Sequence, residues 1–241
     1  MTPSSPSILL SPRLAGLLYL AVIGLGLFGE GVVRGGLVVG GDAAATARNI
    51  LADESLWRLG IAGDLTMHLL DVPLIVFFYL LLRPVSPALA LLATAFNLVQ
   101  TCVLALNKLS LVAVLSLLAV PPGAPGALEA PTLAMGLINL HGAGFAIGLL
   151  FFGVTCVLRG ALIVRSGYVP RTLGALLVLA GLCYLVNSFA LLLSPTLAAA
   201  LFPAVLMPAF VAELLLSLWL LQARPQALQE AMAARLRTTA A

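Results

Sequence analysis

The sequence predicts an all-α integral membrane protein, a six-helix transmembrane bundle with a short amphipathic helix in its first outer loop. Hydrophobic residues make up 62% of the 241 positions and charged residues only 9%, and the mean hydropathy is +1.15. Soluble domains carry about 25% charged residues. Six apolar runs each reach the length that a bilayer requires, about 20 residues. Composition and run length therefore exclude a soluble globular domain.

The order of the runs predicts the domain organisation. Residues 1–12 are rich in Pro and Ser and are expected to be a disordered tail, followed by a membrane domain over 13–222. The expected spans cover 14–33, 58–83, 88–120, 132–158, 172–193 and 204–221. Asp42 is a suitable N-cap for a helix that ends near Leu51 in the first loop. In the cytoplasmic tail, 223–241, apolar residues at helical spacing predict a short helix at the membrane surface.

The arginines predict the orientation. With the N-terminus inside, eight arginines fall on the inner side and three on the outer side, which favours N-in and C-in in a bacterial plasma (inner) membrane. The inner set is Arg13, Arg83, Arg159, Arg165, Arg171, Arg224, Arg235 and Arg237, and the outer set is Arg34, Arg48 and Arg58. The net charge of +3 does not indicate nucleic-acid binding, because no basic cluster has interleaved aromatic residues. The lipid bilayer is the expected partner, and the oligomeric state stays open.

The second predicted span contains the most informative stretch of the chain. Asp64, His68 and Asp71 lie four and seven positions apart, which places them on one face of a helix. A charged side chain at the centre of a bilayer costs at least ~2.5 kcal/mol. These three groups must therefore face protein or water rather than lipid.

The other spans place polar residues at a similar depth. With a rise of about 1.5 Å per residue, Asp64, His68, His141 and Glu213 lie roughly 9–15 Å below the outer ends of their helices. We expect the polar side chains of the outer half to meet, either as a network that fixes helix packing or as a site for a small ligand, ion or lipid. The ligand-binding candidates are Glu30, Arg34, Asp64, His68, Asp71, Lys108, Asn139, His141, Asn187 and Glu213.

Two chemical alternatives follow from the residue types. Asp64, His68, His141 and Glu213 are the kinds of residue that bind a divalent metal, as in a metal-dependent intramembrane hydrolase, although no HExxH-like spacing accompanies them. His68 and His141 could instead hold a haem from both sides in a redox protein. No cofactor is predicted, and a non-enzymatic role is favoured. The three cysteines lie within apolar runs and are expected to pack between helices.

Two segments of the chain resemble a known family. GDAAATARNILADESLWRLGIAGDL from Gly41 and LIVRSGYVPRTLGALLVLAGLCYLVNSF from Leu162 are similar to bacterial membrane proteins of the family called domain of unknown function 4386. The HGAGFAIGLLFFG stretch from His141 adds to the resemblance, which extends over about residues 13–222. The resemblance implies a multi-pass membrane protein and brings no catalytic residue.

Overall fold

The computed structural model describes residues 11–121 and 123–239, and in these residues the chain is helical with no strand. Its helices are α1 (Pro12–Leu27), η1 (Phe28–Arg34), α2 (Gly35–Leu37), α3 (Ala43–Ala52), α4 (Glu54–Leu82), α5 (Pro87–Leu118), α6 (Ala130–Ser166), α7 (Arg171–Leu193), α8 (Pro195–Leu201), η2 (Ala204–Leu206), α9 (Met207–Gln222) and α10 (Pro225–Thr239). Of the disordered tail predicted over 1–12, residues 1–10 lie outside the described residues, whereas Ser11 caps α1 and Pro12 begins it.

Six segments are long and apolar enough to cross a membrane. They are Pro12–Leu37, Glu54–Leu82, Pro87–Leu118, Ala130–Ser166, Arg171–Leu193 and Ala204–Gln222. The predicted all-α architecture with six spans is therefore confirmed, and the chain is a multi-pass membrane protein. The orientation across the membrane remains a prediction, because the fold is the same whichever end faces the cytoplasm.

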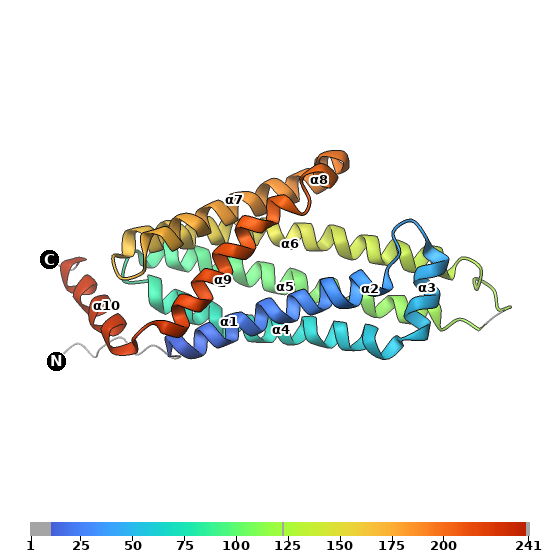
Figure 1. Cartoon of the computed structure of the whole chain (residues 1–241), viewed down its shortest axis with the longest axis horizontal. Helices are drawn as coiled ribbons and strands as arrows, with labels where there is room; N and C mark the ends of the chain where they lie inside the picture. The colour runs from blue at the N-terminus through green and yellow to red at the C-terminus, as the bar shows by residue number, and fades with distance from the viewer. Residues whose placement is uncertain (1–10, 122, 240–241) are drawn as a thin grey trace.

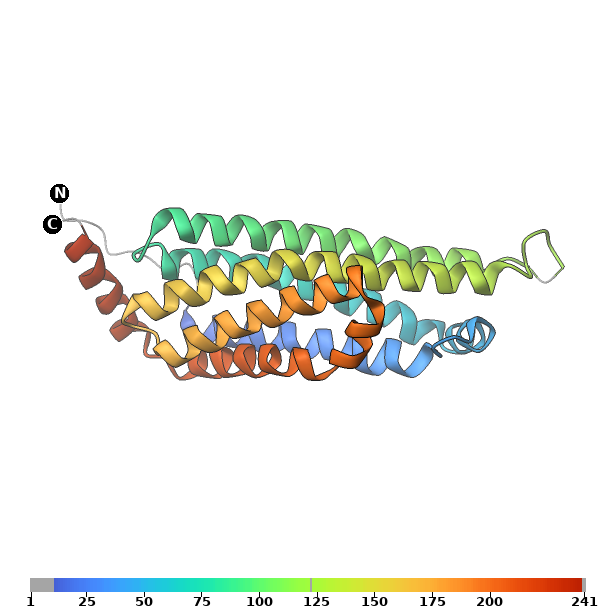
Figure 2. The same ribbon diagram turned by 90° about the horizontal axis from the view of Figure 1, so that it is seen from above.

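The six spans form a closed ring. Close packing joins α1 to α4, α4 to α5, α5 to α6, α6 to α7, α7 to α9 and α9 back to α1. Figures 1 and 2 show an elongated bundle with α10 and the start of α1 at one end, here called the α10 end. The opposite end, the α3 end, carries α3 and the segment 123–129. In both views α7 and α9 stop short of the α3 end, so only η1–α2, α4, α5 and α6 continue there.

Local sequence signals explain several helix starts. Ser11 and Ser86 each accept a hydrogen bond from a backbone N–H three residues on, and each is followed by a proline at the first helical position. The Asp42 carboxylate accepts from Ala45 N at 2.8 Å, so the predicted N-cap and the helix in the first loop are confirmed. Asp53 caps α4 through Leu56 N, which starts that span at Glu54, four residues earlier than expected.

The largest correction concerns α6, which was expected to end near Leu158. The helix continues to Ser166 and ends at Gly167, whose φ of 80° suits glycine. Gly160 does not break it, because α7 packs closely there: a Cβ at Gly160 would lie 2.6 Å from Gly174 O. Arg159, expected in an inner loop, is therefore inside the bundle and 4% exposed. It must be removed from the arginines that predict the orientation, and so must Arg34, which lies within the span Pro12–Leu37 and is 8% exposed; this leaves seven against two.

Candidate ionic site between four helices

A buried ion cluster centres on Asp64 of α4. Its carboxylate accepts two hydrogen bonds from the Arg34 guanidinium, at 2.8 and 3.2 Å, and Lys108 Nζ of α5 lies 3.0 Å away. The side chains of Asp64, Lys108 and Arg34 are 1%, 3% and 9% exposed. One carboxylate thus serves two cations that come from two other spans, so the cluster ties η1, α4 and α5 together.

Glu30 and His141 extend the cluster to α6. Glu30 Oε1 lies 2.9 Å from Arg34 Nη2 and 3.7 Å from His141 Nε2, and its side chain is 48% exposed. Asn107 of α5 places its amide nitrogen 3.0 Å from His141 Nδ1 and 2.8 Å from His141 O. Because an amide nitrogen only donates, Nδ1 must accept, and a neutral His141 then carries its proton on Nε2, which faces Glu30. Asn107 therefore positions the imidazole for Glu30.

The backbone around the cluster is specialised. Glu30 and Arg34 lie in η1, a π-helical segment, and π-helical turns are frequent at functional sites. Gly29, also in η1, makes room for the ion pair: a Cβ there would overlap Asp64 Oδ1 and lie 2.7 Å from Arg34 Nη2. Gly144 of α6 makes room for the Asn107 amide in the same way. Two glycines thus allow the buried polar groups to approach the neighbouring backbone.

Three buried nitrogen atoms at this cluster have no hydrogen-bond partner within the described chain. They are Arg34 Nε, His68 Nε2 and His141 Nε2. The His68 ring is 4% exposed and interacts electrostatically with Lys108 and Asp64. A buried polar group without a partner costs about 1–3 kcal/mol, so three of them around one ion cluster is unusual for a purely structural network.

Asp71 belongs to a second polar cluster, about two turns further along α4. Thr101 Oγ1 donates to its carboxylate at 2.5 Å and Asn97 Nδ2 at 3.3 Å, both from α5. The Asn97 carbonyl oxygen accepts a 2.6 Å hydrogen bond from Arg159 of α6. The Arg159 guanidinium also lies over the Phe78 ring, 4.1 Å from its centroid. Asn97 therefore links Asp71 of α4 to Arg159, which the sequence had predicted to lie in a loop.

Glu213 does not join Asp64. It accepts a 2.5 Å hydrogen bond from the Tyr184 hydroxyl of α7 and interacts electrostatically with Arg159 and Asp71. Of the other candidates, Asn139 is exposed, and Asn187 is 4% exposed. The ten candidates therefore divide. The cluster at the α3 end contains Glu30, Arg34, Asp64, His68, Lys108 and His141; Asp71 and Glu213 lie deeper in the bundle; and Asn139 and Asn187 belong to neither set of contacts.

The metal alternative has no geometric support in the part of the chain described. No three His, Cys, Asp or Glu side chains come together there as a metal site would require. Asp64 is already bonded to two cations, and Glu213 contacts Tyr184 instead. The residues missing from the candidates are Asn97, Thr101, Asn107, Arg159 and Tyr184. Asn97, Thr101 and Asn107 carried a signal, since they are polar residues within the same apolar span as Lys108.

The fold and the buried ionic clusters define a polytopic α-helical membrane protein whose polar groups are shared between several spans. The chain belongs to the family described as Domain of unknown function (DUF4386), which matches residues 14–223. It is also 29% identical over 130 residues to an uncharacterized protein of Archaeoglobus fulgidus, an alignment that covers 53% of this chain and 64% of that protein, less than two thirds of its length. No solved structure matches.

Proposed function

We propose that the protein is a bacterial plasma-membrane protein that binds a small ligand, ion or lipid through the ionic cluster around Asp64. The observation that carries the proposal is the set of three buried nitrogens without a hydrogen bond within the described part of the cluster, one of which, His141 Nε2, lies 3.7 Å from Glu30 Oε1. A network that served packing alone would be selected to satisfy them. The π-helical backbone that presents Glu30 and Arg34 supports the same conclusion.

The charges favour a ligand with an anionic group. The buried arginine, lysine and carboxylate of the cluster are Arg34, Lys108 and Asp64, so with neutral His68 and His141 the buried set carries one net positive charge. Glu30 balances this charge from a half-exposed position and contacts Arg34 through one oxygen atom. A carboxylate or phosphate on a ligand can reach the same nitrogens that Glu30 reaches, and charge-assisted hydrogen bonds of this kind are among the stronger ones in proteins.

The test uses purified protein in detergent and simple probes. Succinate, inorganic phosphate, glycerol 3-phosphate and choline are added separately at millimolar concentration, and the melting temperature is recorded. Wild type and the control variant Arg58→Gln, which removes an exposed cation from the same helix as Asp64, should be stabilised by at least one anion and not by choline. Lys108→Met should lose that response. The proposal fails if no anion stabilises the wild type and native mass spectrometry finds no co-purified small molecule or lipid.

The membrane assignment and its orientation have a separate test. Seven arginines on one side predict that both termini are cytoplasmic. Reporter fusions at Gly41, Gly123 and the C-terminus should place the two loops outside and the C-terminus inside. A periplasmic C-terminus would show that the arginine bias was misread.

A further inference from the structure

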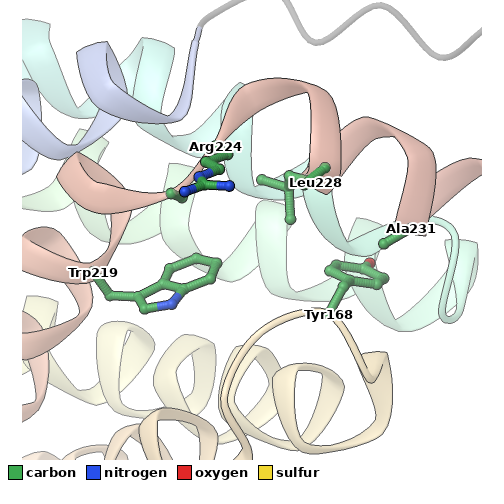
Figure 3. Close-up of a pocket in the computed structure, with 7 residues that line it drawn as sticks. Tyr168, Trp219, Arg224, Leu228 and Ala231 are labelled. Atoms are coloured by element: carbon green, nitrogen blue, oxygen red, sulfur yellow. The ribbon is translucent and has the colours of Figure 1, made fainter.

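A pocket of about 320 Å3 lies at the α10 end, well away from the Asp64 cluster. It is lined by the last turns of α9, the first turns of α10 and the turn between α6 and α7, through Tyr168, Trp219, Ala223, Arg224, Ala227, Leu228 and Ala231. Figure 3 shows Trp219 and Tyr168 on one side, with Arg224, Leu228 and Ala231 across from them. Two aromatic rings, a cation and small apolar side chains therefore surround one open space.

The pocket lies where a membrane meets water. Trp219 is in the last turn of the span Ala204–Gln222, and Tyr168 lies between the spans that end at Ser166 and begin at Arg171. Trp and Tyr favour the level of lipid headgroups because their rings are amphipathic. The ends of these spans and the two aromatic rings therefore favour a pocket level with the phosphate groups of one leaflet.

The α10 helix is held in place as the wall of this pocket. Its apolar residues Leu228 and Met232 are 5% and 0% exposed, while most of the rest of its surface is polar. The Tyr168 hydroxyl donates to Leu81 O at 2.5 Å, and burial raises the pKa of this phenol above its ordinary value, so it stays protonated and keeps that bond. The side chains on both sides of the pocket are therefore held in place, although α10 lies outside the six-helix bundle.

The charge around the pocket is strongly positive. The described residues at the α10 end include seven arginines, Arg13, Arg83, Arg165, Arg171, Arg224, Arg235 and Arg237, and a single acid, Glu230. Outside the Asp64 cluster, the described residues at the α3 end include two arginines, Arg48 and Arg58, and four acids, Asp42, Asp53, Glu54 and Glu129. Arg224 is exposed and, within the described chain, makes no ion pair. An available guanidinium at headgroup level, beside a helix N-terminus, favours a phosphate group.

We propose that this pocket binds the headgroup of an anionic phospholipid. Arg224 contacts the phosphate, Trp219 packs against the glycerol and upper acyl region, and the first turn of α10 offers backbone N–H groups that have no acceptor within the helix. The site contains none of the residues of the Asp64 cluster, so its test is independent of the test of the proposed function.

The test counts lipids on the whole protein by native mass spectrometry and measures melting temperature in detergent. Phosphatidylglycerol, phosphatidylcholine and, as soluble probes, glycerol 3-phosphate and inorganic phosphate are titrated into wild type, Arg224→Gln and the control Arg171→Gln. Arg171 is an exposed arginine at the same end that does not line the pocket. We expect wild type and Arg171→Gln to retain one phosphatidylglycerol with equal affinity, and Arg224→Gln to bind it roughly five- to tenfold more weakly.

Three outcomes would overturn the proposal. An equal loss in Arg224→Gln and Arg171→Gln would mean that diffuse charge, and not the pocket, retains the lipid. Displacement of the lipid by glycerol 3-phosphate at low concentration would identify a soluble phosphate as the ligand. Equal retention of phosphatidylcholine by the wild type would show that the pocket does not select an anionic headgroup. A second variant, Trp219→Phe, keeps an aromatic ring but removes the indole N–H and part of the ring surface, and should weaken lipid binding without loss of the fold.

Discussion

Replacement of Asp64 by asparagine gives the sharpest test of how the ionic cluster stabilises the bundle. The substitution keeps the shape of the side chain and removes its charge, while Arg34 and Lys108 remain buried at 9% and 3% exposure. Removal of one partner from a buried ion pair costs about 3–5 kcal/mol, because the other charge is left uncompensated. For a chain of this size each kcal/mol changes the melting temperature by about 2–4 °C, so we expect a decrease of roughly 6–20 °C.

The assay is thermal unfolding in detergent, with a matched control on the same helix. Glu54→Gln breaks the Arg58–Glu54 pair, whose side chains are 64% and 45% exposed, and exposed pairs contribute only about 0–1 kcal/mol. If Asp64→Asn is no less stable than Glu54→Gln, water must already solvate the cluster, and the expected cost of about 3–5 kcal/mol is refuted. The substitution should then abolish ligand binding while leaving the melting temperature unchanged.

A second substitution tests whether Asp64→Asn destabilises the bundle by leaving the Lys108 charge uncompensated. Lys108→Met in the Asp64→Asn background removes a cation that, among the described residues, forms no ion pair with another acid, whereas Arg34 keeps Glu30 at 2.9 Å. The double variant should therefore be more stable than Asp64→Asn alone by about 1 kcal/mol or more, a clear departure from additivity. An additive result would show that Asp64 and Lys108 do not interact.

Two further substitutions test contacts that the tertiary structure revealed. Gly29→Ala should lower the melting temperature by several degrees, because its Cβ would overlap the central carboxylate of the cluster, whereas Gly31→Ala in the same π-helical segment meets open space and should change it little. Tyr184→Phe removes the 2.5 Å donor to Glu213 and should cost about 1–3 kcal/mol in thermal unfolding, against a small change for Tyr79→Phe. Equal effects of each substitution and its control would contradict the assigned contacts.

The sequence was sufficient for the architecture because the bilayer restricts the possibilities. Continuous apolar runs of about 20 residues satisfy their backbone inside lipid as helices, and the number of such runs gives the number of spans. The same reasoning placed Asp64, His68 and Asp71 on one face of α4, since helical periodicity is local. The Asp42 cap of α3 was predictable for the same reason: it depends on residues three positions apart.

The partners of the polar residues required the tertiary structure. The depth of a residue along its helix shows which side chains lie at a similar distance from the membrane surface. On that basis Glu213 and Asp64 were predicted to lie close together. The rotation of each helix about its axis, which depth does not specify, directs Glu213 to Tyr184 instead. The position of Arg159 could not be predicted from local sequence either. Gly160 stays within α6 because the helix packs there against Gly174 of α7, fourteen residues further along the chain. Helix ends and polar partners that depend on close packing between spans are decided only when the spans assemble.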